Sequence, residues 1–159
     1  MSKKVTNVVI GGLGGQGVIR ASDVLADAAL RAGFEVKKSE LHGMSQRGGS
    51  VSSDVRYGTE VLSPMVPTGE ADFLVVLAAD QVEPNRHVLK EGGVLLVSSQ
   101  IVEKQLANKK SMNVAMLGLL SKYLPEIGEE HWAAALKACF PEKLWAGNEK
   151  VFALGREMK

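Results

Sequence analysis

Short apolar runs alternate along the chain with segments whose apolar residues recur at helical spacing. Residues 5–10, VTNVVI, form a β-branched apolar run that predicts a buried strand. After a cluster of glycines, apolar residues recur every three or four positions up to Ala32, which predicts a helix ending at Gly33. Residues 34–40, FEVKKSE, predict a second strand. This order of strand, glycine turn, helix and strand is that of a βαβ unit.

A second unit of the same kind follows later in the chain. Residues 71–78, ADFLVVLA, form the clearest buried strand, and residues 93–98, GVLLVS, form another. The stretch between them, up to Lys90, has helical spacing. The sequence therefore predicts an α/β fold, with a Rossmann-like, mostly parallel sheet and flanking helices.

Two further regions complete this predicted fold. Residues 51–57 alternate between apolar and polar positions, and Gly58 and Thr59 then predict a turn towards residues 60–66, so we expect an inserted β-hairpin at a sheet edge. After residue 100 the pattern is helical, which predicts a helical C-terminal region. No linker or repeat interrupts the chain, and we expect one domain over residues 1–159.

Composition narrows the classes of function. A formal net charge of +1 among 159 residues provides no field that would gather nucleic acid or an anionic membrane. No apolar run approaches the roughly 18 residues of a membrane span, and the first residues hold no long apolar region, so a cytoplasmic protein is expected. Cys139 alone cannot supply the several thiolates of an iron-sulfur cluster. Three scattered histidines and the lack of a G-x-S-x-G motif predict neither a metal site nor a catalytic nucleophile.

The glycine cluster is the first candidate binding element. Residues 11–18, GGLGGQGV, contain the spacing Gly12-x-Gly14-x-x-Gly17, together with Gly15 and Gln16, between a predicted strand and a predicted helix. Such glycines let the backbone turn tightly and approach a phosphate at the N-terminus of the helix. The alternative is a glycine-rich turn that only packs the helix against the sheet.

The end of the second predicted strand indicates which phosphorylated ligand fits. A domain that binds NAD places an acidic residue there, whereas this chain has Lys37 and Lys38. The cations favour a ligand with an additional phosphate on its ribose, such as NADP or coenzyme A. Alternation along a strand lets only one of the two lysines face the ligand, and two solvated lysines remain an alternative. Glu40 is the nearest acidic residue, so an NAD site remains an alternative.

The loop at residues 40–50, ELHGMSQRGGS, is predicted to reach the same edge of the sheet. Arg47 can clamp a phosphate or carboxylate, and the backbone around Gly48, Gly49 and Ser50 can form a second anion-binding loop. A glycine-rich exposed loop can equally dock against another protein.

These motifs together match a known family. GGLGGQGV, SELHGMSQRGGSVSSDVRYG, MNVAMLG and NEKVFALGRE resemble the gamma-type subunits of 2-oxoacid:ferredoxin oxidoreductases, and the loop is most similar to the smaller subunits of indolepyruvate ferredoxin oxidoreductases. The resemblance spans nearly the whole chain. It departs from the family pattern between residues 98 and 112, where this chain is shorter.

The resemblance implies a Rossmann-like subunit of an enzyme that decarboxylates a 2-oxoacid, here indolepyruvate or another aryl pyruvate, to an acyl-coenzyme A. It implies coenzyme A at this chain, thiamine diphosphate and iron-sulfur clusters on larger partner subunits, and ferredoxin as the indirect partner that takes the electrons. Carried over by motif, the anion turn is Gly12, Gly14, Gly15, Gln16 and Gly17, and the second loop is Arg47, Gly48, Gly49 and Ser50.

Two other functions remain open from the residues alone. A small NADP-linked oxidoreductase fits the turn and the lysines, although 159 residues leave little room for a substrate domain. A purely structural Rossmann-like subunit, docking through its apolar C-terminal helices, fits a glycine loop with no ligand.

Overall fold

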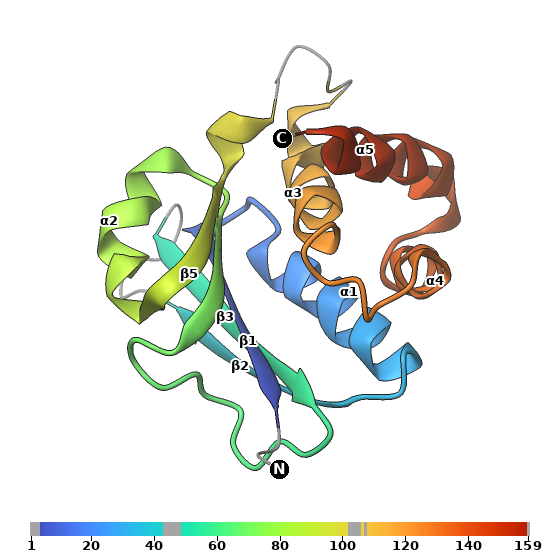
Figure 1. Cartoon of the computed structure of the whole chain (residues 1–159). Coiled ribbons are helices and arrows are strands. Elements are labelled where there is room, and N and C mark those ends of the chain that lie inside the picture. Colours follow the sequence, from blue (N-terminus) through green and yellow to red (C-terminus); the bar gives the residue numbers. More distant parts are fainter. Residues whose placement is uncertain (1–3, 43–48, 102–105, 107, 159) are drawn as a thin grey trace.

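The fold is built on one five-stranded sheet (Figure 1). The computed structural model describes residues 4–40, 49–101, 106, 108 and 110–158 in full, and the backbone of residues 41, 42 and 109. The strands are β1 (Val5–Leu13), β2 (Glu35–His42), β3 (Ser50–Gly58), β4 (Ala71–Val76) and β5 (Leu89–Val97), and they lie in the order β2-β3-β1-β4-β5. β1, β4 and β5 are parallel neighbours, whereas β3 runs antiparallel to both β1 and β2.

The helices lie on both faces of this sheet. On one face pack α1 (Val18–Arg31) and α3 (Met112–Ser121), with α4 (Glu129–Cys139) packed outside α1 and α5 (Trp145–Glu157) packed outside α3. The short α2 (Val82–Asn85) covers the other face (Figure 1). Short 3-10 turns flank α2, namely η1 (Ala79–Gln81) and η2 (Arg86–Val88), and η5 (Lys109–Ser111) precedes α3. The α/β class, the flanking helices and the helical C-terminal region are as predicted.

The apolar periodicity of the sequence accounts for the two cores. The larger core lies between the sheet and α1, where Val24, Leu25 and Ala28 are fully buried against Val8 and Ile10 of β1. A smaller core lies beneath α2 and contains the alternate residues of β1 and β4, such as Val9 and Leu74. β1 is therefore apolar on both faces, as expected of a central strand.

The inserted antiparallel strand lies in a different place from the one predicted. β3 does not form an edge hairpin with residues 60–66, which contain no strand; it pairs with β2 on one side and β1 on the other. Residues 60–66 instead fold over the polar face of β3, where Val66 N donates to Asp54 Oδ2 (2.9 Å) and Arg56 donates to the carbonyl oxygens of Ser63 and Met65. The polar face of β3 is satisfied by loop backbone, which lets the strand lie inside the sheet.

α3 and α5 approach each other closely through two glycines. A Cβ on Gly155 would lie 1.9 Å from the carbonyl oxygen of Ala115, and a Cβ on Gly118 would lie 2.1 Å from that of Phe152. Real Cβ atoms are never this close to a carbonyl oxygen. The C-terminal helix therefore docks on α3 only because both contact positions lack a side chain.

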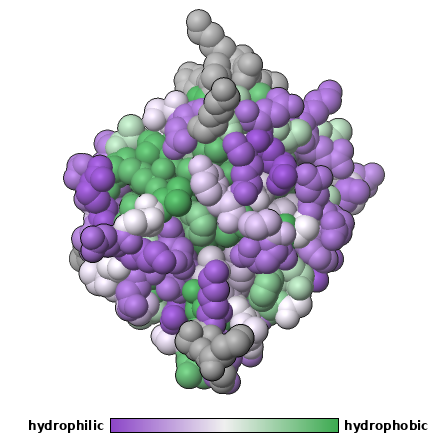
Figure 2. All heavy atoms as spheres, in the orientation of Figure 1, coloured by the Kyte–Doolittle hydropathy of each residue, from purple (hydrophilic) through white to green (hydrophobic). Residues whose placement is uncertain are grey.

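Hydrophilic residues cover much of the face drawn in Figure 2, with an apolar patch towards the side where α2 and β5 lie. Among the described residues, no helix has the length and apolar character required to cross a bilayer.

Candidate functional site

The glycine turn follows β1 directly and opens α1. Gln16 holds it in shape, because its Oε1 accepts from Leu13 N (2.7 Å) and its Nε2 donates to Leu77 O (3.3 Å). Gly15 and Gly17 have φ angles of 90° and 79°, a region that L side chains rarely adopt. Gln16 thus braces the turn, and the glycines give it a backbone path that other residues would strain.

Close packing explains two of the turn glycines. A Cβ on Gly12 would lie 2.9 Å from Val18 Cγ2 and 3.2 Å from Leu77 Cβ, so Gly12 lets α1 start close to the sheet. A Cβ on Gly17 would lie 2.5 Å from Asn113 Nδ2. By contrast, no atom lies within 4 Å of the Cβ position of Gly15, so this glycine faces open space.

The N-terminal ends of two helices meet at this turn. Gly17 is the N-cap of α1 and supplies no side-chain hydrogen bond, which leaves the N–H groups of the first turn available to an anion. Asn113, in the first turn of α3, is 5% exposed and donates from Nδ2 to Gly17 O (3.3 Å). The positive ends of both helix dipoles therefore lie near the turn. Asn113 had not been identified from the sequence.

The second predicted loop reaches the glycine turn, as far as it is described. Gly14 N donates to Gly49 O (2.9 Å), and Ser50 Oγ donates to Gln81 Oε1 (2.8 Å). Gly49 is buried, and Ser50 opens β3. Arg47 and Gly48 lie outside the described residues. The structure thus brings Gly12, Gly14, Gly15, Gln16, Gly17, Gly49 and Ser50 to one edge of the sheet.

The two lysines do not lie at the end of their strand. β2 continues to His42, and Lys37 and Lys38 lie in its middle, opposite Arg56 and Val55 of β3. The predicted strand, residues 34–40, ended two residues too early. Glu40 lies within β2 and accepts from Lys38 Nζ (2.7 Å).

Lys37 and Lys38 have different environments. Lys38 Nζ contacts Asp23 of α1 (2.5 Å) as well as Glu40. Burial lowers the pKa of Lys38, but its hydrogen bonds to the two carboxylates outweigh this, so that the pKa is raised above its ordinary value. Lys37 points to the opposite face of the strand and is exposed, with no ion pair to any described residue. Lys37 is therefore the freer of the two cations.

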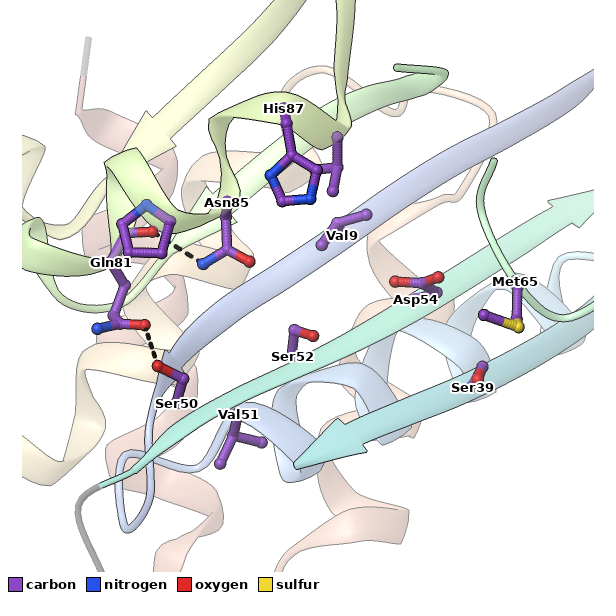
Figure 3. Close-up of a pocket in the computed structure, with 12 residues that line it drawn as sticks. Val9, Ser39, Ser50, Val51, Ser52, Asp54, Met65, Gln81, Asn85 and His87 are labelled. Carbon is purple, nitrogen blue, oxygen red and sulfur yellow. Dashed lines mark hydrogen bonds between the residues drawn. The ribbon is translucent and has the colours of Figure 1, made fainter. Parts of the chain in front are cut away.

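A cavity of about 300 Å³, lined by both polar and apolar residues, lies on the face of the sheet away from α1 (Figure 3). Asn85 and His87, from α2 and η2, lie on one side of it, and Ser52 and Asp54 of β3 lie on the other (Figure 3). Asn85 also covers the last part of β1, since a Cβ on Gly11 would lie 2.9 Å from its Nδ2. The cavity therefore adjoins the strand that leads into the glycine turn.

Asp54 is the carboxylate of this cavity. Burial raises its pKa, while the hydrogen bond from Val66 N and the charge of Arg56 act in the opposite direction, and the pKa remains above its ordinary value. The alternation of residues 51–57 had placed Asp54 on the polar face of its strand. It gave no sign of a cavity there, because α2 and η2 come from a distant part of the chain.

Replacing Asp54 with Asn should stabilise the fold slightly at neutral pH. The amide oxygen can still accept from Val66 N, while the cost of burying a charge is removed. Because the folded-state pKa is raised, this cost is absent below the unfolded-state pKa of 3.8 and grows as pH rises through the folded-state pKa. Urea unfolding of both proteins between pH 3 and pH 7 measures the difference in their unfolding free energies, with Ser52→Ala as a control for changes in the cavity. A difference that becomes smaller as pH rises would contradict this account.

Comparisons with known proteins agree with this arrangement. Residues 7–103 match the family described as pyruvate ferredoxin/flavodoxin oxidoreductase. The indolepyruvate oxidoreductase subunit IorB of Thermococcus kodakarensis is 41% identical over 143 residues, which cover 89% of this chain and 68% of the relative. The chain belongs to the pyruvate ferredoxin/flavodoxin oxidoreductase family. The resemblance found in the sequence is confirmed, and so is its classification among the oxidoreductase subunits.

Solved structures share the fold. The gamma subunit of a keto/oxoacid ferredoxin oxidoreductase from Geobacter sulfurreducens superposes with a TM-score of 0.82 at 24% identity, covering 98% of this chain and 99% of that one. A 2-oxoglutarate:ferredoxin oxidoreductase from Magnetococcus marinus, with 2-oxoglutarate, coenzyme A and succinyl-CoA bound, gives the same TM-score at 25% identity. That match covers 98% of this chain and 31% of the other.

Proposed function

We propose that this chain is the coenzyme A-associated, non-thiamine subunit of a 2-oxoacid:ferredoxin oxidoreductase that uses indolepyruvate or another aryl pyruvate. The observation that carries the proposal is the glycine turn, where an uncapped α1 and the first turn of α3 direct positive dipole ends to one place. The bound coenzyme A of the Magnetococcus marinus enzyme, which contains a chain region of the same fold, supports the choice of ligand.

In this proposal the chain holds the phosphates and leaves redox chemistry to its partners. Backbone N–H groups of Gly15, Gly17 and the first turn of α1 donate to the diphosphate, while Gln16 keeps the turn in shape. Lys37, Lys38 and the loop of Arg47, Gly48, Gly49 and Ser50 are proposed to surround the remaining anionic groups. Cys139, as the one cysteine of these 159 residues, supports placing the iron-sulfur clusters on a partner.

The proposed partners are larger subunits that carry thiamine diphosphate and the clusters, with ferredoxin receiving the electrons from them. The names of the relatives support an aryl oxoacid, because those at 40–41% identity over most of the chain are indolepyruvate oxidoreductase subunits. Leu62 and Met65, which are 84% and 61% exposed, support contact with another subunit, since large apolar side chains are usually covered.

Calorimetric titration of coenzyme A into the enzyme assembled from this chain and its larger subunit tests the proposal. Replacing both Lys37 and Lys38 with Ala should weaken binding by about 1–3 kcal/mol, the range for charge-assisted contacts. Lys37→Ala alone should account for most of the loss, because Lys38 is already paired with Asp23 and Glu40.

Arg86→Ala serves as the control for a lost positive charge, because Glu83 is the one described residue that pairs with Arg86, on the exposed α2 and η2 segment. It should leave coenzyme A affinity unchanged. An assembled enzyme that binds no coenzyme A would overturn the proposed function, whereas unchanged affinity in the double lysine variant would remove only the role of the lysines.

A further inference from the structure

A second cavity, here named the α5 cavity, lies between η5 and one side of α5. It has a volume of about 390 Å³. Leu144, Val151 and Leu154 give it an apolar wall, and at Gly147 no atom lies within 4 Å of the Cβ position, so the wall is open there. None of its lining residues belongs to the glycine turn or to the cavity beside Asp54. The α5 cavity can therefore accept an apolar group without involving either site.

The rim of the α5 cavity is cationic and rich in donors. Lys143 and Lys150 line it, both are exposed, and neither forms an ion pair with a described residue. Asn108 and Ser111 add an amide and a hydroxyl on the opposite side, and none of the described lining residues carries a carboxylate. A group that enters this rim meets positive charge and hydrogen-bond donors, so the rim favours an anion.

The acidic residues of α5 lie in a different groove. Glu149 and Glu157 line the groove between α4 and α5, together with Glu129. On α5, Lys150 lies at the α5 cavity, whereas both carboxylates and Arg156 lie at the other groove. The positive charge of the α5 cavity is not cancelled at the rim by the carboxylates of the same helix.

Asn148 provides an independent indication of a ligand. This side chain lines the α5 cavity, is 6% exposed, and its Nδ2 has no hydrogen-bond partner among the described residues. Buried amide donors without an acceptor are unfavourable and rare in native proteins. Nδ2 is itself shielded, but a half-turn of the amide exchanges the positions of Nδ2 and Oδ1 and gives up no hydrogen bond of Nδ2. A ligand oxygen in the cavity can then supply the acceptor that the protein lacks.

We propose that the α5 cavity binds an amphiphilic anion, a molecule with an apolar chain that ends in one carboxylate or phosphate group. The apolar chain lies along Leu144, Val151 and Leu154, and the anionic group is held by Lys143, Lys150 and Asn148. This site is separate from the proposed coenzyme A turn, and its existence does not depend on the proposed function.

Isothermal titration of the full chain with four probes tests the proposal. Hexanoate and monohexyl phosphate combine both features, whereas 1-hexanol lacks the charge and acetate lacks the chain. Hexanoate or hexyl phosphate should bind saturably, and hexanol and acetate should bind about tenfold more weakly or worse. The tighter of the two amphiphiles identifies the anionic group.

Variants of the chain locate the binding. Lys143→Ala combined with Lys150→Ala should weaken binding of the amphiphile about tenfold, while Lys4→Ala combined with Arg86→Ala, which changes net charge equally, should not. Asn148→Leu should weaken binding several-fold without lowering Tm, because the amide it removes has no partner. The proposal is overturned if neither amphiphile binds saturably, or if the double lysine variant binds as well as the unmodified chain.

Discussion

Replacing Gly155 with alanine should destabilise the fold by about 3 kcal/mol or more, the upper part of the range for overpacked sites. The added methyl group would lie 1.9 Å from the carbonyl oxygen of Ala115, and backbone cannot rotate away as a flexible side chain does. α5 must move off α3, which uncovers Phe152, a core residue that is only 8% exposed. Urea unfolding followed by circular dichroism measures the loss.

Gly147→Ala is the matched control on the same helix. No atom lies within 4 Å of its Cβ position, so the substitution should stabilise the fold by about 0.5–1 kcal/mol through helix propensity. Opposite signs for the two glycine substitutions are the expected result. Equal effects would show that α3 and α5 separate easily, and that their close contact contributes little to stability.

Replacing Gly15 with alanine should weaken coenzyme A binding by the assembled enzyme about tenfold or more, if the proposed function holds. The methyl group would enter the open space at the turn, where a phosphate oxygen must come within hydrogen-bond distance of the backbone. The positive φ of 90° adds a strain of about 1 kcal/mol to the folded protein. Calorimetry and urea unfolding measure the two effects separately.

Gly33→Ala separates strain from ligand contact. Gly33 has a φ of 98°, and its Cβ position is also open, but it follows α1 at the end remote from the turn. Both substitutions should cost similar stability, and only Gly15→Ala should change affinity. If Gly15→Ala binds coenzyme A normally, the phosphates lie elsewhere and the glycine turn only packs α1.

Local patterns predicted the elements of this fold well. The apolar spacing from Val18 predicts α1, and the two buried strands near residues 71–78 and 93–98 correspond to β4 and β5. Helical periodicity likewise predicts α3, α4 and α5. These elements follow from neighbours in sequence, because burial of one face imposes a period of two on a strand and of 3.6 on a helix.

The site was predicted only in part, because some of its contacts join residues that are far apart in the sequence. Its glycines and Gln16 are contiguous, so their spacing alone indicates a turn between a strand and a helix. Asn113 is 96 residues from Gly17, and its hydrogen bond to the turn leaves no pattern in the sequence. The ion pair of Lys38 with Asp23 was also not predicted, because it joins β2 to α1.

By itself, the sequence determined the α/β class, the order of the elements apart from the strand expected at residues 60–66, and the glycine turn at the end of β1. Each of these depends on local periodicity or on backbone freedom at glycine. Only the tertiary structure decided that β3 lies between β1 and β2. It also decided that Lys38 pairs with two carboxylates, whereas Lys37 forms no ion pair with a described residue. The physical reason is that a strand with alternating apolar and polar residues can bury its apolar face equally well at the edge of a sheet or inside it. Loop backbone and side chains from distant elements settle the choice by pairing the polar groups of Asp54, Arg56 and Lys38.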